Sequence, residues 1–349
     1  MLPIGKVKKD FLEQVIFSKL NSNPKILSHP KHGVDTGAIQ INNEKVIVFS
    51  TDPLSIIPSI GFKNSGWLSA HILTNDFVTC GFPPEYVTLN FNLPPAINDE
   101  DFKKFWNSLI KEFDKMGISV ISGHTGRYNG CDYSIVGAGT IIGIGQESQY
   151  INSSMAKIGD SIIITKGIAI EATSILAKAF PNIISEKIGK SLVRKAQRTF
   201  HQCSVVKDAI IASSIGVKDN GVTTMHDATE GGLFGGLAEI ASASSKGLFI
   251  EKDDIFLSEE AEAICNLFEL DPYTTLSSGT MIMTIRPEKE IEVMNKLKNK
   301  GIISSKIGKI ISNKNECYYR EKGKKKNITI QDEDLYWKIF WNATHKGWT

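Results

Sequence analysis

The sequence of 349 residues lacks the features that mark several large classes of protein. No apolar run approaches the ~20 residues that a membrane-spanning helix needs, and the first residues lack the charged-then-apolar pattern of a secretory signal. The five cysteines are widely scattered, and no two of them form a C-x-x-C pair. An odd number of cysteines without a signal peptide is typical of a reducing compartment. We therefore expect a cytoplasmic protein that has no disulfide framework and does not act at a membrane.

A strong charge of either sign is also absent. Lys and Arg number 40 against 38 Asp and Glu, which leaves a net charge of +2. Such a balance produces no large field toward nucleic acid or a membrane surface, so neither is expected as a partner. The one local basic run, at residues 322–326, is predicted to be a solvated loop.

The order of apolar and polar residues predicts an α+β protein of two domains. Strand-like and helix-like patterns mix without a strict βαβ rhythm, and the expected domains cover residues 1–155 and 156–320, followed by a tail at 321–349. Helical spacing places the apolar side chains of residues 10–20 on one face. A second amphipathic helix is predicted at residues 99–117, with Asp99 as its cap and Gly117 at its end.

The stretch "MHDATEGGL", residues 225–233, concentrates polar side chains and a glycine pair before a long run of helix formers. One interpretation is a turn, in which Asp227 or Thr229 caps the helix and the glycines allow the bend. The other is a phosphate or metal site, because a helix N-terminus offers free N–H groups and the positive end of a dipole.

Four other segments place polar residues beside glycine, just beyond an apolar strand, or in a polar break. They contain Asp35, Asp52, the pair Asn75–Asp76, and Gly123-His124-Thr125. Carboxylates at such positions suit hard cations such as Mg²⁺, and glycine-flanked N–H groups suit phosphate oxygens. Taken singly, each segment is typical of a turn.

Taken together and in order, these segments resemble the PurM-like superfamily of aminoimidazole ribonucleotide synthetase, and most closely its hydrogenase-maturation family HypE. The resemblance covers roughly residues 1–310. It rests on "VFSTDPLSIIP", "GWLSAHILTNDFVTCGFPPEYVTLNF", "VISGHTGR", "GDSIIITKGI" and "MHDATEGGL". It favours the site over the simple turn at residues 225–233.

The resemblance implies an N-terminal mixed-sheet domain that binds ATP and dimerises through its sheet. It also implies a C-terminal α+β domain that closes over the nucleotide. The implied Mg²⁺ ligands are Asp35, Asp52, Asp76 and Asp227, and the implied nucleotide contacts are Lys6, Asn75, Gly123, Thr125, Asp227, Thr229, Gly231 and Gly232. The candidates for acid–base or phosphate chemistry are His124, His226 and Glu230.

Two departures bear on the activity. HypE chemistry uses a cysteine at its extreme C-terminus, whereas the last cysteine here is Cys317, and Glu230 stands where HypE often has arginine. We expect a homodimeric ATP- and Mg²⁺-dependent enzyme that transfers the γ-phosphoryl group to an oxygen of a small substrate. One alternative is a non-catalytic nucleotide-binding accessory protein that docks a protein partner through the aromatic tail. The other is a kinase of the thiamine-monophosphate type.

Overall fold

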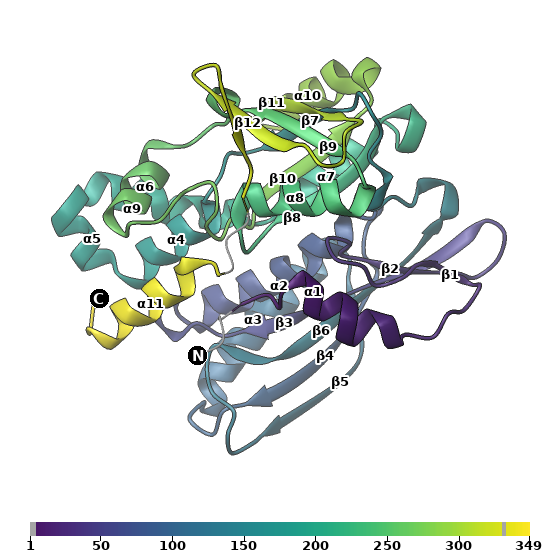
Figure 1. Cartoon of the computed structure of the whole chain (residues 1–349). Helices are drawn as coiled ribbons and strands as arrows, with labels where there is room; N and C mark the ends of the chain where they lie inside the picture. Colours follow the sequence, from purple (N-terminus) through teal and green to yellow (C-terminus); the bar gives the residue numbers. More distant parts are fainter. Residues whose placement is uncertain (1–4, 330–332) are drawn as a thin grey trace. The chain divides into compact units, whose positions relative to one another are not determined.

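A computed structural model describes residues 5–329 and 333–349 of the chain, which form two compact units. The larger unit comprises Met1–Ser22, Pro30–Val34 and Ile151–Thr349. The smaller unit comprises Asn23–His29 and Asp35–Tyr150. Each unit contains one mixed β-sheet with helices packed against it (Figure 1).

The smaller unit is built on a six-stranded sheet with the order β1-β2-β3-β6-β4-β5. Its pairs are antiparallel except for β4 and β5, which run parallel. Helix α2 packs against β3 and β6, and α3 packs against α2 (Figure 1). The elements are β1 (Ile26–Ser28), β2 (Gly37–Gln40), β3 (Lys45–Ser55), α2 (Phe62–Val78), β4 (Tyr86–Leu93), α3 (Asp99–Met116), β5 (Ser119–Arg127) and β6 (Ile135–Gln146).

Helix α3 shows how closely local sequence sets an element here. Its buried stripe includes Phe105, Leu109 and Phe113, which recur at helical spacing. Gly117 ends the helix in the left-handed conformation, with φ 74°. The predicted cap was wrong by one residue: the side chain of Asn98, rather than that of Asp99, accepts the hydrogen bond from the Asp101 N–H at 2.8 Å.

The larger unit is built on a seven-stranded sheet with the order β13-β12-β9-β11-β7-β10-β8. Its pairs are antiparallel except for β12 and β9. The strands are β7 (Ser161–Thr165), β8 (Val222–Ala228), β9 (Gly247–Glu251), β10 (Thr280–Ile285), β11 (Ser304–Ile311), β12 (Cys317–Glu321) and β13 (Lys324–Asn327). The helices that follow the N-terminal segment are α4 (Ile170–Ala179), α5 (Pro181–Ile188), α6 (Lys190–Arg198), α7 (Val206–Ser213), α8 (Gly232–Ser244), α9 (Glu259–Leu267), α10 (Glu290–Asn299) and α11 (Leu335–His345).

The centre of the larger sheet is buried on both faces. Every residue of β7 and β10 is buried, as expected for strands that read as continuous apolar runs. Leu233, Leu237 and Ile240 of α8 join the same core. Ser245 ends α8 with φ 56°, and Gly247 begins β9.

The N-terminal segment is helical, as its pattern predicts, but its apolar face is not buried. It consists of a short α1 (Lys9–Phe11), a π-helical turn (Leu12–Ile16) and a 3₁₀ turn (Phe17–Lys19). Phe11 is 50% exposed and Leu20 is 48% exposed. Helical spacing identified the face but not the absence of a covering layer among the described residues.

The basic run near the end of the chain is not a plain loop. Strands β12 and β13 form a hairpin whose turn contains Lys322 and Gly323, and β12 extends the sheet beside β9. Helix α11 follows, with Tyr336 and Phe340 fully buried. Residues 330–332 of the predicted tail lie outside the described residues. The aromatic residues of α11 therefore contribute to the core of this unit.

The fold class predicted from the sequence is confirmed, because both units combine a mixed sheet with packed helices. Within the described residues, no helix is both long enough and apolar enough to cross a membrane.

Candidate functional site

The residues singled out in the sequence are divided between the two units. The smaller unit contains Asp35, Asp52, Asn75, Asp76, Gly123, His124 and Thr125. The larger unit contains Lys6, His226, Asp227, Thr229, Glu230, Gly231 and Gly232. The two groups are considered separately.

In the smaller unit, Asp52 lies within a strand and not in a loop. It belongs to β3 and pairs with Gly139 of β6, which pairs in turn with Leu89 of β4 and through it with Gly123 of β5. Three strand spacings therefore separate Asp52 from Gly123, a distance of roughly 14 Å. One chain cannot bring these two positions to the same phosphate.

The other acidic candidates of this unit occupy different elements. Asp35 precedes β2, and Asp76 lies in the last turns of α2 beside the fully buried Asn75. Both aspartates are partly exposed. Among the described residues, no three His, Cys, Asp or Glu side chains are placed to hold a metal ion. The carboxylates of this unit that the structure describes therefore do not form a preformed metal site.

The Gly123-His124-Thr125 segment is part of β5, an edge strand, and was wrongly predicted to be a loop. All three residues are exposed, and Nε2 of His124 is 2.7 Å from the Tyr128 hydroxyl. Val120 and Ile121 of the same strand are 41% and 55% exposed. This edge of the sheet thus presents apolar side chains on a strand that pairs on one side only, with β4.

In the larger unit, His226 and Asp227 also lie in a strand, β8, instead of the loop that the sequence suggested. Both side chains are buried. One carboxylate oxygen of Asp227 accepts a hydrogen bond from the backbone N–H of Gly279 at 3.3 Å. Asp227 therefore does not cap the helix that follows.

His226 joins a buried ionic network around Glu239 of α8. The carboxylate of Glu239 is 2.7 Å from Nε2 of His226, 3.3 Å from Nζ of Lys6 and 4.0 Å from Nε2 of His32. Burial alone would raise the pKa of Glu239, but the positive charge of Lys6 and the hydrogen bond with His226 hold it well below its usual value. This network ties the N-terminal segment to α8, and the sequence did not point to Glu239.

Glu230 is bound by two segments that are remote in the sequence. The backbone N–H of Lys6 donates to one carboxylate oxygen at 2.7 Å, and Nε1 of Trp337 donates to the other at 3.1 Å. This charged residue thus accepts hydrogen bonds from both the N-terminal segment and α11. The sequence, which suggested Glu230 for acid–base or phosphate chemistry, did not point to these partners.

The glycine pair makes the sharp turn from β8 into α8. Gly231 and Gly232 have φ angles of 82° and 61°. A Cβ atom on Gly232 would lie 2.7 Å from the carbonyl oxygen of Thr275 and 2.8 Å from that of Tyr273. Both the backbone conformation and the lack of space therefore require glycine at 232.

The first N–H groups of α8 are already used within the unit. The Gly231 N–H donates to the Asp334 carboxylate at 3.3 Å, and the Gly232 N–H donates to the Thr229 carbonyl at 3.0 Å. The Phe234 N–H donates to the Tyr273 carbonyl. The helix N-terminus that was predicted to receive phosphate is therefore partly capped by the chain itself.

Acidic groups gather around this turn. Burial, together with the negative charge of Glu230, raises the pKa of Asp334 to about 6 and that of Glu171 to about 7. A cavity of about 300 Å³ lies beside them. It is lined by Lys6, Val7, Lys8, Lys9, Asp10, His32, Glu230, Gly231, Gly235, Glu239, Thr274, Glu333 and Asp334.

Sequence reasoning missed Asp334, which accepts from the Tyr336 N–H at 2.9 Å as the N-cap of α11. An aspartate directly before the helix-forming run "LYWKIFW" was a usable local signal for the cap. Its contact with Gly231, 103 residues away, had no signal in the sequence.

Four of the five cysteines have no features of nucleophiles. Burial raises the pKa of Cys80 and Cys265 to about 12 and that of Cys317 to about 11. Cys203 is also fully buried, and its pKa is raised for the same reason. Thiolates form least readily in such surroundings.

Comparison with known proteins identifies a family over both halves of the chain. The family described as "AIR synthase related protein, N-terminal domain" matches residues 33–144, and its C-terminal domain matches residues 157–319. The chain is 27% identical to a putative hydrogenase expression/formation protein of Methanocaldococcus jannaschii over 286 residues, which cover 81% of each chain.

Two solved structures have the same fold. The hydrogenase maturation protein HypE in complex with ATP aligns with a TM-score of 0.68 and 18% identity, covering 96% of this chain and 98% of that one. A ThiL protein complexed with AMPPCP and TMP aligns with a TM-score of 0.70 and 16% identity, covering 93% and 97%. At these identities the likeness concerns the fold alone.

Proposed function

Because the chain belongs to the AIR synthase related family, we propose that it is an ATP- and Mg²⁺-dependent enzyme. It transfers the γ-phosphoryl group to an oxygen of a small substrate, which activates that oxygen as a leaving group or yields a phosphorylated product. The observation that carries this proposal is the match of both halves to one family, on a fold shared with a HypE protein that holds ATP.

Asp35, Asp52 and Asp76 would hold Mg²⁺ around the triphosphate, and Asn75 would support the nucleotide. Bound Mg²⁺ would supply charge neutralisation at the phosphates. Because these carboxylates form no three-ligand cage, we propose that the metal arrives with the nucleotide. This fits the usual chemistry of Mg²⁺, which takes one or two protein carboxylates, keeps several waters and shares the phosphates of the substrate.

In this proposal, the glycine turn of the larger unit does not bind a bare phosphate through its backbone N–H groups. The Asp334 carboxylate occupies the Gly231 N–H, and Glu230 adds a second carboxylate beside it. Like charges would repel a bare phosphate at this position. We therefore propose that Asp227, Thr229, Gly231 and Gly232 face a Mg²⁺-bound phosphate or the substrate.

The two candidate histidines, His226 and His124, lie in different environments, and we therefore propose different roles for them. His226 is buried against Glu239, which makes it a positioning residue for the N-terminal segment and Lys6. His124 is exposed on β5 beside Tyr128, so it can reach a bound ligand. We propose that His124, and not His226, is the histidine with an acid–base role.

A homodimer formed through the sheet of the smaller unit is part of the proposal. The edge strand β5 leaves Val120 and Ile121 exposed, and an exposed apolar edge is a template for pairing with another chain. Light scattering after size-exclusion chromatography should give twice the chain mass. An Ile121→Lys variant should shift this species toward the monomer.

The alternatives differ in their products. A kinase of the thiamine-monophosphate type is favoured by the likeness to the ThiL structure, and it would convert ATP to ADP and a phosphorylated product. A non-catalytic accessory protein is favoured by the self-capped turn, in which Asp334 and Trp337 already satisfy the neighbouring groups.

Turnover experiments separate these cases. Purified protein is incubated with Mg-ATP and pools of small substrates, while ADP, free phosphate and phosphorylated products are followed together. The activating enzyme gives substrate-dependent ADP with equal free phosphate, the kinase gives ADP without free phosphate, and the accessory protein gives neither. Asp52→Asn should abolish turnover, whereas the exposed Asp114→Asn serves as the matched control.

A further inference from the structure

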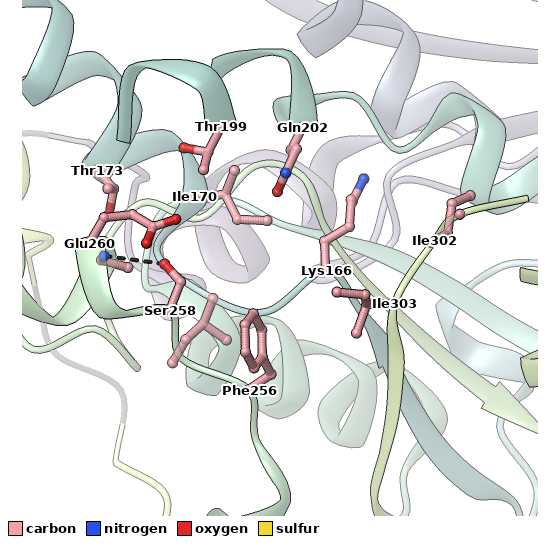
Figure 2. A pocket seen from close by; sticks show the side chains of 13 residues that line it. Lys166, Ile170, Thr173, Thr199, Gln202, Phe256, Ser258, Glu260, Ile302 and Ile303 are labelled. Atoms are coloured by element: carbon pink, nitrogen blue, oxygen red, sulfur yellow. Dashed lines mark hydrogen bonds between the residues drawn. The ribbon is translucent and has the colours of Figure 1, made fainter. Parts of the chain in front are cut away.

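A second cavity, of about 290 Å³, lies in the larger unit and shares no lining residue with the cavity beside Glu230. Its volume is near the lower limit of roughly 300–1,000 Å³ for small-molecule sites. The lining comes from the turn after β7, the start of α4, the 3₁₀ segment Thr199–Cys203, the approach to α9 and the residues after α10. Figure 2 shows side chains from these segments around one hollow.

The turn after β7 forms part of the cavity wall. Its backbone is strained, but hydrogen bonds hold it in place. Lys166 and Ala169 have positive φ angles of 65° and 57°, a conformation that costs a non-glycine residue on the order of 1 kcal/mol or more. The Ala169 N–H donates to the Ser277 hydroxyl at 2.8 Å, and the Gly167 carbonyl accepts from the Thr280 hydroxyl at 2.7 Å. These bonds hold the wall in place without a ligand.

One polar atom in the lining has an unmet hydrogen-bonding capacity. Thr173 of α4 is 1% exposed, and its hydroxyl has no hydrogen-bond partner within the described part of the chain. A buried hydroxyl without a partner is unusual, because its desolvation is then uncompensated. A ligand in the cavity could supply that partner.

The charged residues of the lining are one lysine and one glutamate, and the lysine already has a carboxylate partner outside the lining. Among the described residues that line the cavity, Lys166 is the only cation, and its ammonium group is 2.7 Å from the Asp208 carboxylate and 2.6 Å from the Ser204 carbonyl oxygen. Glu260 adds a carboxylate, while the nearby Lys195 bonds to Glu259 instead. An anionic ligand would therefore meet the Glu260 carboxylate, whereas the ammonium group of Lys166 is already held by Asp208.

The walls between these polar groups are apolar and include one aromatic ring. Ile170 and Phe256 lie between the Thr173–Glu260 side and the Ile303 side in Figure 2. Phe256 is 43% exposed, which is high for a large apolar side chain beside a cavity. A Cβ atom on Gly167 would lie 2.8 Å from this ring, so glycine allows the turn to approach it. Such walls suit a flat, apolar group.

We propose that this cavity binds a compact aromatic ligand that carries an amine or amidine group. Its ring would pack against Phe256 and Ile170, and its N–H groups would donate to the Glu260 carboxylate and the Thr173 hydroxyl. The charged hydrogen bond to Glu260 would give the selectivity for cations. This site is separate from the residues proposed for ATP and Mg²⁺.

Three probes of matched shape and different charge test the proposal: benzamidine, benzamide and benzoate. Calorimetric or NMR titration of the full chain should show saturable binding of benzamidine, with benzoate at least roughly tenfold weaker. Benzamide, which keeps the N–H donors without the charge, should fall between them. The absence of saturable benzamidine binding, or equal affinities for benzamidine and benzoate, would overturn the proposal.

Substitutions in the cavity lining test whether benzamidine binds at this site. Glu260→Gln should weaken benzamidine binding at least roughly tenfold, while Glu262→Gln, exposed on the same helix, should leave it unchanged. Thr173→Val removes a hydroxyl that lacks a partner in the free protein. It should therefore weaken binding several-fold without lowering the thermal midpoint of the free protein. Unchanged affinity in both Glu260→Gln and Thr173→Val would place the probe elsewhere and refute the assigned site.

Discussion

Replacing Glu171 by glutamine should stabilise the larger unit at alkaline pH and leave it almost unchanged at acidic pH. Glu171 is 6% exposed in the first turn of α4, and one of its carboxylate oxygens has no partner among the described residues. Burial raises its pKa to about 7, against the hydrogen bonds from Ser278 that lower it. The negative charges of Glu230 and Asp334 contribute to this rise of the pKa.

The sign follows from proton binding in the two states. The folded state keeps the proton on Glu171 up to about pH 7, whereas the unfolded chain releases it near the ordinary value of 4.5. Stability is therefore complete below the lower value and falls as the pH rises toward the higher one. The difference between 4.5 and about 7 corresponds to a loss of roughly 3 kcal/mol above both values.

Glutamine keeps the shape of the side chain and can still accept from Ser278, but it never ionises. We expect Glu171→Gln to raise the free energy of unfolding by about 1–3 kcal/mol near pH 8 and by about zero near pH 4, below the ordinary value of 4.5. Urea unfolding at the two pH values, followed by circular dichroism, measures both differences. Glu262→Gln, exposed on α9, is the matched control and should show neither.

The reasoning about Glu171 would be refuted by a variant that is no more stable than the parent near pH 8. It would equally be refuted by the same shift at both pH values, because a pH-independent gain would come from packing and not from ionisation.

Three further substitutions test the packing around the candidate site. Gly232→Val should lower stability by about 2 kcal/mol or more, because its Cβ would lie 2.7 Å from the Thr275 carbonyl oxygen; an unchanged thermal midpoint would contradict this. Trp337→Phe removes the N–H that donates to Glu230 and should cost about 1–3 kcal/mol in urea unfolding; a cost near zero would mean that solvent replaces this bond. Asp160→Asn breaks the ion pair between the fully buried Asp160 and the partly exposed Arg286; by the same measurement it should cost more than the ~1 kcal/mol of a surface pair and up to the ~3–5 kcal/mol of a buried one, and a cost below about 1 kcal/mol would contradict this.

The elements of this protein were predictable where short-range pattern determines them. Helix α3 has an apolar stripe at helical spacing and a glycine in the left-handed conformation at its end, so nearby residues suffice to specify it. The strand β4 alternates buried and more exposed residues through most of its length. The class α+β followed from such local patterns.

The polar residues were harder to place, because pairing between distant strands decides where they lie. Asp52 is followed by proline, a local turn signal, yet β3 continues beyond it by pairing with β6. His226 and Asp227 similarly extend β8 by pairing with β10. A polar residue within a buried strand needs partners, and those partners, Glu239 and the Gly279 N–H, are remote in the sequence.

The environment of the glycine turn was the least predictable part of the candidate site. The pair of glycines marked the turn itself, because a tight bend with positive φ is what two glycines permit. The groups that cap it come from more than 100 residues away, since Asp334 and Trp337 bond to Gly231 and Glu230 at separations of 103 and 107 residues. No short-range pattern contains that information.

The most direct test of the central proposal is calorimetric titration of the full chain with ATP, in the presence and absence of Mg²⁺. If Asp35, Asp52 and Asp76 hold the metal around the triphosphate, Mg-ATP should bind at least roughly tenfold more tightly than ATP alone. Asp52→Asn should remove most of that difference, while Asp114→Asn retains it. Equal affinity for ATP with and without Mg²⁺, or the absence of any ATP binding, would contradict the account.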